Sequence, residues 1–242
     1  MSVPDLTTDS ALFTDLDGTL VEIGGSPDHV AVDPALPALL GRTGERLAGA
    51  IAVVSGRNVA TVDAMLGGAV RAVAGVHGLE RRSAAGTLTI ENVPEALLMQ
   101  ARRVLADFVR DHAGVLLEDK GLALALHFRQ APEHGPACLA ALEGVLARGD
   151  GLMIQHGKMV AELRGAGHTK GDAVGRFLEE APFAGRCPVF IGDDVTDEDS
   201  FRVVNARGGW SVRVGDASDS AAQHSLPDVA AVHRWLGAFA HG

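Results

Sequence analysis

The chain has 242 residues, enough for one large domain or for a core with a smaller inserted domain. Its 31 acidic residues outnumber its 21 lysines and arginines, and the formal net charge of -10 disfavours a nucleic acid or an anionic membrane surface as a partner. An aromatic share of 4% also leaves few platforms for stacking bases, so we expect no nucleic-acid role.

The apolar pattern and the cysteine usage favour a cytoplasmic protein. Residues 1–10 lack the basic start and the apolar stretch of a signal peptide. No apolar run approaches the about 18 residues that a membrane span needs. Only Cys138 and Cys187 are present, too few for a disulfide framework. We therefore expect a cytoplasmic monomer without a membrane partner.

Short apolar runs alternate with helical patterns through much of the chain. The runs predict strands near residues 11–15, 50–54, 71–74, 188–192 and 210–214. Strands that alternate with helices are typical of an α/β fold, here a doubly wound, Rossmann-like parallel sheet.

The pattern changes between residues 82 and 164. Pro94 begins a predicted helix with an apolar stripe. Two strands near 115–119 and 122–128, a helix near 136–148 and a hairpin near 151–163 that turns at His156-Gly157 follow it. We predict an inserted smaller α/β cap domain over residues 82–164, within a discontinuous core of residues 1–81 and 165–242.

The first predicted strand ends in two carboxylates, Asp15 and Asp17, followed by Gly18. Side chains alternate along a strand, so both carboxylates can point the same way at its carboxyl end, where open α/β sheets place their ligands. One carboxylate can attack phosphorus, while the other protonates the leaving oxygen and later deprotonates water. Two close carboxylates also need a cation, and Mg2+ prefers such ligands. The segment predicts phosphoryl transfer.

A calcium loop or a plain acidic turn is the competing interpretation of this segment. An EF-hand needs oxygen ligands at its first, third and fifth positions and a glutamate at its twelfth. Counted from Asp15, the fifth position is Thr19 and the twelfth is Ser26, so the calcium-loop pattern is not met.

Two later clusters offer groups that could bind a phosphoryl oxygen. Ser55-Gly56-Arg57 follows a predicted buried strand and supplies a hydroxyl and free amides, although serine and glycine also end strands for turn reasons. Lys170, ahead of an amphipathic helix, can neutralise a transferring phosphoryl group. A nucleotide P-loop is disfavoured there, because Thr169 stands where the pattern requires glycine before the lysine.

A further acidic cluster follows the strand predicted near 188–192. It contains Asp193, Asp194, Asp197 and Glu198, which make a hard-cation site plausible. Acidic residues are also favoured at a helix N-terminus by the macrodipole, and both interpretations can hold together.

These four segments, in this order, resemble the signatures of the haloacid dehalogenase superfamily of phosphatases. Within it the sequence is most similar to the trehalose-6-phosphate phosphatase family. That narrower likeness rests on Ala74 to Glu80, on Glu118-x-Lys120-Gly121 with His127-x-Arg129, on Glu162, and on the Gly-Asp-Asp-x-Thr-Asp-Glu form of the last motif. One segment departs from the family pattern, since residues 164–168 read Arg-Gly-Ala-Gly-His instead of a basic residue followed by proline.

The resemblance implies a role for each motif residue. Asp15 would be the nucleophile and Asp17 the general acid and base, while Ser55 and Lys170 hold the phosphoryl oxygens. Mg2+ would be held by the Asp15 carboxylate, the Asp17 backbone carbonyl and Asp193, with Asp197 and Asp194 completing or supporting the shell. Such a division suits phosphoryl transfer, which needs positioning and charge stabilisation.

The predicted cap strands place polar side chains on one face. These and the core candidates could hydrogen-bond sugar hydroxyls, which need both donors and acceptors. The predicted substrate-binding set is Gly56, Arg57, His77, Glu80, Glu118, Lys120, His127, Arg129 and Glu162. A solvated sheet face with cross-strand ion pairs is the alternative for the cap residues.

The function implied by the resemblance is the magnesium-dependent hydrolysis of trehalose 6-phosphate to trehalose and phosphate, the last step of trehalose biosynthesis. A phosphatase for another sugar phosphate, of the sucrose 6-phosphate or mannosyl-phosphoglycerate type, stays open because of the altered 164–168 segment. A phosphomutase would share the first step, and a non-catalytic sugar-phosphate sensor is the alternative from another class.

Overall fold

The computed structural model describes residues 3–24, 30–216 and 219–242, so the interpretations that involve residues 1–2 and Ser26 lie outside it. The chain divides into two compact units, a core unit of Met1–Thr89 with Thr169–Gly242 and an inserted unit of Ile90–His168. The first boundary lies later than the one predicted at 82, because strands β4 and β5 continue the core sheet beyond residue 81; the second lies at His168 and not at 164.

The core unit contains an eight-stranded sheet in the order β12-β11-β10-β1-β2-β3-β4-β5. Neighbours from β12 to β3 pair in parallel, and β3 pairs with β4 in antiparallel. The strands are β1 (Ser10–Thr14), β2 (Ile51–Val54), β3 (Ala72–Gly75), β4 (Glu80–Arg82), β5 (Leu88–Ile90), β10 (Cys187–Gly192), β11 (Trp210–Val214) and β12 (His224–Leu226). The predicted α/β fold with a mainly parallel sheet is confirmed.

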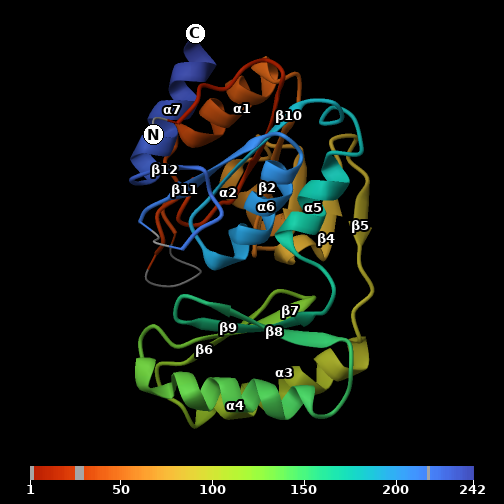
Figure 1. The fold of residues 1–242 in the computed structure, drawn as a ribbon. Coiled ribbons are helices and arrows are strands. Elements are labelled where there is room, and N and C mark those ends of the chain that lie inside the picture. Colours follow the sequence, from red (N-terminus) through yellow and green to blue (C-terminus); the bar gives the residue numbers. More distant parts are fainter. Residues whose placement is uncertain (1–2, 25–29, 217–218) are drawn as a thin grey trace. The chain divides into compact units, whose positions relative to one another are not determined.

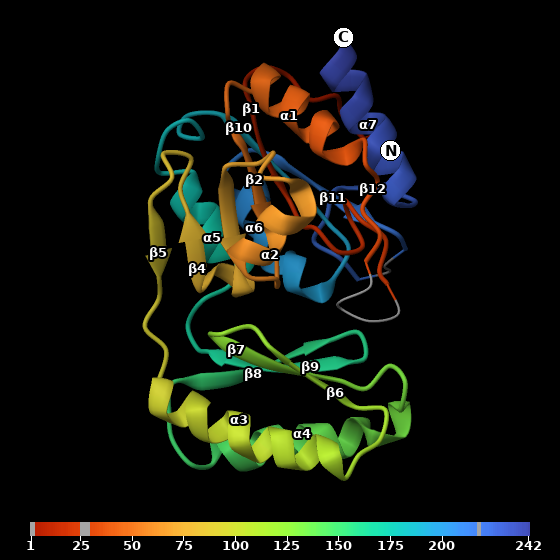
Figure 2. The ribbon, with the colours of Figure 1, turned by 180° about the vertical axis from the view of Figure 1, so that it is seen from behind.

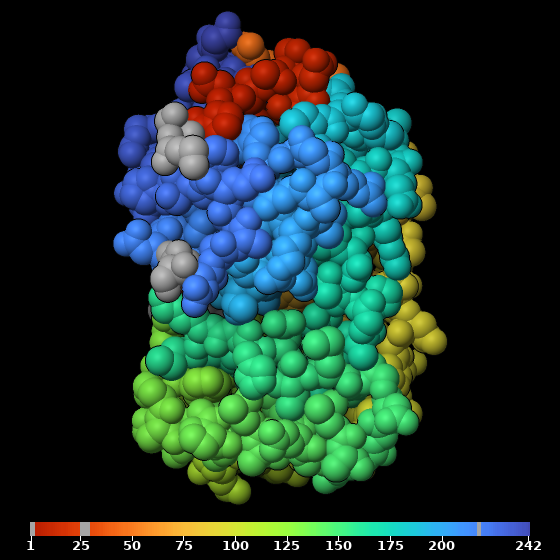
Figure 3. All heavy atoms as spheres, in the orientation of Figure 1, coloured from red at the N-terminus to blue at the C-terminus, as the bar shows by residue number. Residues whose placement is uncertain are grey.

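Helices cover both faces of this sheet. They are α1 (Leu36–Arg46), α2 (Val59–Leu66), α5 (Lys170–Phe177), α6 (Glu198–Ala206) and α7 (Val229–His241). Helix α1 packs against α7, and α5 packs against α6. Figures 1 and 2 show α5 and α6 on one face and α1, α2 and α7 on the other. Side chains coloured cyan to blue fill the α5 and α6 face of the core unit (Figure 3).

The order of the strands creates a switch point between β1 and β10. The chain leaves β1 toward β2 and β3 on one side, whereas β10 leads to β11 and β12 on the other. Thr14 at the end of β1 pairs with Ile191 near the end of β10. Loops that follow two such strands diverge and leave room for a ligand, so this is where an open α/β sheet is expected to bind one.

The inserted unit contains a four-stranded antiparallel sheet in the order β6-β7-β9-β8 and two long helices. Its elements are α3 (Glu95–Arg110), β6 (Leu116–Asp119), β7 (Ala123–His127), α4 (Gly135–Leu146), β8 (Leu152–Gly157) and β9 (Val160–Gly165). Helices α3 and α4 pack together and against this sheet. Among the described residues, no helix is long and apolar enough to cross a membrane.

The hairpin of the inserted unit turns later than predicted. Strand β8 continues through Gly157, which pairs with Val160, so the turn residues are Lys158 and Met159 rather than His156 and Gly157. Met159 adopts a φ of 63°, the left-handed conformation that tight hairpin turns use. The prediction of a turn at His156-Gly157 was wrong because it relied on a glycine, and the register places that glycine inside the strand.

Candidate active site

Three carboxylates meet at the switch point of the core sheet. Asp15 follows β1, Asp193 follows β10, and Asp197 ends a short 3-10 helix (Val195–Asp197) that begins two residues later. One carboxylate oxygen of each residue lies within 4.8 Å of an oxygen of the other two. Asp15 is 4% exposed and Asp197 is fully buried, so their charges are poorly screened by water.

Lys170 supplies the positive charge inside this cluster. Its Nζ donates to Asp15 Oδ1 at 2.7 Å and to Asp197 Oδ1 at 2.8 Å. The lysine is the first residue of α5, which begins at the capping box of Thr169 and Asp172. Phe177 of the same helix stacks on Phe13 of β1, with ring centroids 6.1 Å apart, so apolar packing holds the helix that carries Lys170 beside the strand that carries Asp15.

Burial and mutual repulsion perturb the ionisation of the cluster. Burial raises the pKa of Asp15 well above its ordinary value; Lys170 opposes the rise, and the charges of Asp197 and Asp193 add to it. Burial, followed by the charge of Asp197, raises the pKa of Asp193 to about 7. Burial would lower the pKa of Lys170, but the two carboxylates outweigh it and raise that pKa above its usual range. The single lysine leaves the cluster short of positive charge.

Asp197 organises the backbone of the acidic loop. Its Oδ2 accepts the backbone N–H groups of Asp193 and Asp194, each at 3.0 Å. The loop approaches the strand end so closely that a Cβ on Gly192 would lie 2.4 Å from the Asp197 carboxylate carbon. Both oxygens of Asp197 are therefore engaged, one with Lys170 and one with the loop, which suits a residue that holds the site in shape.

Gly18 allows the loop after β1 to pass close to Asp193. It has a φ of 83°, and a Cβ at this position would lie 2.2 Å from Asp193 Oδ2. No side chain larger than hydrogen fits without displacing the Asp193 carboxylate. The glycine in the first motif is thus required by close approach as well as by the turn.

Asp17 is held away from the three-carboxylate cluster. Arg57 donates to it through Nε at 2.7 Å and Nη2 at 2.8 Å, a bidentate pair between motifs 40 residues apart. Ser55 is buried, and its Oγ accepts the Arg57 backbone N–H at 3.1 Å. The ion pair between Arg57 and Asp17 was not predicted, because the sequence contains no signal that pairs these two motifs.

His77 and Glu80 lie next to the strand ends of the core sheet. The backbone N–H of His77 donates to the Ser55 carbonyl at 3.0 Å, and its ring lies so near Gly56 that a Cβ there would be 2.7 Å from Nε2. The Glu80 carboxylate accepts the backbone N–H of Val59 at 2.9 Å, at the start of α2. His77 therefore supports the loop that carries Ser55, and Glu80 caps a helix.

The candidates in the inserted unit form ion pairs and a backbone contact within its sheet. Lys120 Nζ donates to Glu162 Oε2 at 2.5 Å, and both side chains are largely buried. His127 Nε2 lies 2.8 Å from Glu118 Oε2. The pKa of Glu118 lies below its ordinary value. Burial acts to raise this pKa, but the hydrogen bond with His127 and the charge of Lys120 outweigh burial. Arg129 donates to the Lys158 carbonyl at 3.2 Å.

The segment at residues 164–168 is organised by Arg164. This side chain is 1% exposed and donates to the carbonyls of Gly165 and His168 and to Gln155 Oε1. The buried guanidinium of Arg164 thus binds two backbone carbonyls of this segment. This is the segment in which the family pattern has a basic residue followed by proline. The departure from the family pattern is visible in the sequence, whereas the contacts by which Arg164 stabilises the segment are visible only in the structure.

The acidic cluster fits a hard divalent cation. All three groups offer oxygen donors, and Asp193 Oδ1 is buried without a hydrogen-bond partner among the residues that the structure describes. A buried carboxylate oxygen without a partner is costly unless a cation binds it. Two other predicted ligands, Asp17 and Asp194, contribute no carboxylate to the cluster; Asp194 instead forms a capping box with Asp197.

Comparison with known proteins matches this site to a family. A family model described as trehalose-phosphatase matches residues 13–230. A probable trehalose-phosphate phosphatase of Sinorhizobium fredii (strain NBRC 101917 / NGR234) is 44% identical over 232 residues, which cover 95% of this chain and 87% of that protein. The chain belongs to the trehalose-phosphatase family. Trehalose-6-phosphate phosphatase of Escherichia coli (strain K12) is 40% identical over 233 residues, which cover 96% of this chain and 87% of that protein.

Solved structures show the same fold for this trehalose-phosphatase family member. The C-terminal domain of C. albicans trehalose-6-phosphate phosphatase has a TM-score of 0.83 at 20% identity and covers 97% of this chain and 92% of that one. A trehalose-6-phosphate phosphatase related protein has a TM-score of 0.80 at 25% identity, covering 95% and 96%. The predicted family and the prediction of a phosphatase are both confirmed.

Proposed function

We propose that this protein hydrolyses trehalose 6-phosphate to trehalose and inorganic phosphate, as the last step of trehalose biosynthesis. The observation that carries the proposal is the buried carboxylate of Asp15, ion-paired with Lys170 and within 4.8 Å of Asp193 and Asp197. The family match over residues 13–230 and the names of the two relatives support the choice of substrate.

In the first step, a carboxylate oxygen of Asp15 attacks the phosphorus of the substrate. The bond between phosphorus and the sugar oxygen breaks, and that oxygen takes a proton from Asp17 as trehalose leaves; Asp17 enters this step as the carboxylic acid, with one of its two oxygens released from Arg57. The product on the enzyme is an aspartyl-phosphate. Asp17 suits the proton transfer because it lies two residues after Asp15, its side chain is about one-third exposed, and its carboxylate is not part of the buried cluster.

In the second step, a water molecule attacks the phosphorus of the aspartyl-phosphate. Asp17, now a carboxylate, accepts the proton of the water, and the bond between phosphorus and Asp15 breaks to release phosphate. Arg57 can donate two hydrogen bonds to Asp17 and so orient its carboxylate in this step.

Two groups of the core unit are placed to bind the transferring phosphoryl group. Lys170 Nζ, 2.7 Å from Asp15, offsets charge that accumulates on the phosphoryl oxygens. The Ser55 hydroxyl lies at the end of β2 and can donate to a phosphoryl oxygen. Positioning and charge compensation are the main demands of phosphoryl transfer.

We infer that the cluster binds Mg2+ through the carboxylates of Asp15 and Asp193, with the Asp17 backbone carbonyl as a further ligand. Asp197 supports the shell, since both of its oxygens already accept hydrogen bonds, and Asp194 supports it through the capping box. When bound, Mg2+ supplies positive charge that shields the nucleophile from the substrate dianion.

The sugar is proposed to contact the inserted unit through Glu118, Lys120, His127, Arg129 and Glu162. Their carboxylates and cations offer acceptors and donors to sugar hydroxyls. From the core unit, the proposed substrate-binding residues are Gly56, Arg57, His77 and Glu80. Glu80 would contribute indirectly, because its carboxylate binds the backbone N–H of Val59 at the start of α2.

The test is phosphate release by the purified protein from trehalose 6-phosphate, sucrose 6-phosphate, mannosyl-3-phosphoglycerate and glucose 6-phosphate, with and without Mg2+. Strong preference for trehalose 6-phosphate that depends on Mg2+ is the expected result. Preference for another sugar phosphate would keep the chemistry and overturn the substrate. Isomerised sugar phosphate without phosphate release would indicate a mutase, and binding without turnover a sensor.

A further inference from the structure

The acidic loop between β10 and α6 is held from two opposite sides. On the inner side, the backbone N–H groups of Asp193 and Asp194 donate to Asp197, as described above. On the outer side, the carbonyl of Asp194 accepts Arg213 Nη1 at 3.1 Å, in addition to the backbone N–H of Asp197 at 3.1 Å. The peptide units around Asp194 therefore have a hydrogen bond in each direction, which restricts how they can rotate.

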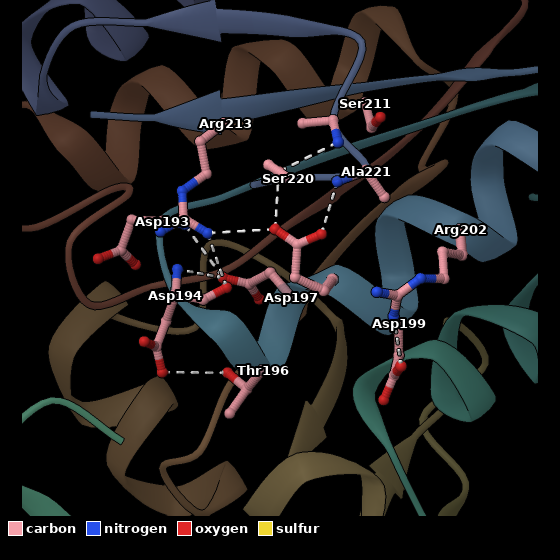
Figure 4. Close-up of polar contacts among 12 residues, drawn as sticks. Asp193, Asp194, Thr196, Asp197, Asp199, Arg202, Ser211, Arg213, Ser220 and Ala221 are labelled. Atoms are coloured by element: carbon pink, nitrogen blue, oxygen red, sulfur yellow. Dashed lines mark hydrogen bonds and ion pairs between the residues drawn. The ribbon is translucent and has the colours of Figure 1, made fainter. Parts of the chain in front are cut away.

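Arg213 reaches this loop from the neighbouring strand. It lies on β11 and pairs in register with Gly192, the last residue of β10 and the residue before Asp193. Its side chain is 17% exposed, so it is ordered by its contacts and not by solvent. Figure 4 shows its guanidinium directed at the loop that carries Asp193 and Asp194.

Glu198 ties Arg213 to a second loop. Its Oε1 lies 3.4 Å from Arg213 Nη1 and accepts the hydroxyl of Ser220 at 2.7 Å. Its Oε2 accepts the backbone N–H of Ala221 at 2.7 Å. Glu198 is 9% exposed and all three contacts come from β11 or from the segment between β11 and β12. A buried carboxylate with this many partners is a rigid anchor.

We propose that Arg213, anchored by Glu198, is a positioning residue for the cation site: it holds the carbonyl of Asp194 and thereby sets the backbone that presents the Asp193 carboxylate. The inference rests on the proposed function only in taking Asp193 as a cation ligand. A guanidinium is itself a cation and cannot ligate a metal ion, so Arg213 acts on the cation through the loop whose Asp194 carbonyl it binds. Groups that orient metal ligands in this way commonly govern metal affinity.

The sign of the effect separates positioning from simple electrostatics. A positive guanidinium near a cation site repels the cation, so removal of the charge alone would strengthen binding. If Arg213 holds the loop, its removal instead takes away one of the two hydrogen bonds of the Asp194 carbonyl, so the loop loosens, Asp193 shifts and binding weakens. The two roles of Arg213 predict opposite changes in the same measured constant.

The experiment measures binding of Mn2+, as a hard divalent probe, to the metal-stripped protein by electron paramagnetic resonance. We expect Arg213→Met and Glu198→Gln each to raise the dissociation constant by about 10- to 100-fold, the usual range for residues behind the ligands. Arg213→Lys keeps a donor for one bond and should lose less. The double variant Arg213→Met with Glu198→Gln should raise the dissociation constant little more than either single variant, because the two residues act together on the same loop.

A matched control and a second readout complete the test. Arg202→Met removes an arginine of α6 that pairs with Asp199 on the surface, both side chains being more than half exposed, and should leave Mn2+ binding unchanged. Saturating Mg2+ should restore most of the phosphate release by Arg213→Met, since the defect lies in cation affinity. A kcat that stays low at saturating Mg2+ with unchanged Mn2+ affinity would overturn the inference.

Two further outcomes are decisive. Unchanged or tighter Mn2+ binding by folded Arg213→Met and Arg213→Lys would show that Arg213 does not position the loop. Asp193→Asn should lose Mn2+ binding, and this variant tests the proposed site itself. Wild-type binding by Asp193→Asn would overturn the cation site and this inference together, whereas a defect confined to Asp193→Asn would overturn the inference alone.

Discussion

Lys170 and Asp15 form a buried ion pair between residues 155 positions apart, with Nζ 2.7 Å from Oδ1. The lysine also bonds Asp197, so one cation serves two carboxylates, and Asp193 lies beside them. Three carboxylates around one ammonium leave the cluster with excess negative charge when they are ionised, and a divalent cation can balance it.

Asp15→Asn is expected to reduce phosphate release at least about a thousandfold, because an amide cannot form the acyl-phosphate. The fold should persist, since the change removes one of several mutually repelling carboxylates and Lys170 keeps Asp197 as a partner. Circular dichroism and steady-state turnover are the measurements. Near-normal turnover by the folded variant would exclude Asp15 as the nucleophile.

Lys170→Met should destabilise the metal-free protein by about 3–5 kcal/mol, because it leaves buried carboxylates without their cation. Urea unfolding at pH 7 checks the free energy of unfolding, and added MgCl2 should recover part of the loss. Lys158→Met, at an exposed turn of the inserted unit, is the control and should change stability little. Equal stability of the two variants would contradict the buried ion pair.

The stability of the metal-free protein should fall as the pH rises from about 4 to 8. The carboxyls of Asp15 and Asp193 have a higher pKa in the folded state, about 7 for Asp193, than in the unfolded chain. Within this window the folded state binds more protons than the unfolded state, so the free energy of unfolding decreases with increasing pH.

Urea titrations at several pH values measure this slope. Asp193→Asn should reduce the slope, because one of the two titrating groups is gone, and MgCl2 should reduce it at neutral pH, because the cation stabilises the charged carboxylates. A metal-free protein whose stability rises steadily from pH 5 to 7 would contradict the raised pKa of Asp193.

Gly18→Ala should abolish most activity and weaken cation binding. The added Cβ would lie 2.2 Å from Asp193 Oδ2 and the position has a φ of 83°, so both the turn and the carboxylate must shift. Gly41→Ala is the matched control: it lies inside α1 with no atom within 4 Å of the added Cβ. It should keep full activity and gain up to about 1 kcal/mol of stability.

Glu162→Gln should raise the KM for trehalose 6-phosphate about tenfold or more, because it weakens a charged contact proposed for the sugar. Turnover of 4-nitrophenyl phosphate, which has no sugar, should change little. Glu143→Gln, exposed on α4 of the same unit, is the control. Equal losses on both substrates would assign Glu162 a structural role.

Much of the core fold was predictable because its signals are local. Buried parallel strands such as β1, β2 and β10 are continuous apolar runs, and polar residues follow them directly. Strands β4, β5 and β12 were missed because each has three residues, is little buried and lacks an apolar run. Such strands form only where an existing sheet edge offers hydrogen bonds.

The residues of the candidate site could be predicted from the sequence, but the contacts between them could not. The motifs around Asp15, Ser55, Lys170 and Asp193 could be named because each follows a strand or begins a helix. Arg213 was not predicted as a site residue, because an arginine within a strand belongs to no motif.

By itself, the sequence determined the family, the parallel α/β core and the residue types available for phosphoryl transfer, since these follow from local patterns and short motifs. Only the tertiary structure decided that Arg57 holds Asp17, that Lys170 joins Asp15 to Asp197, and that Arg213 reaches the loop of Asp194. These contacts depend on which strands become neighbours, and strand order is set by packing across the whole sheet.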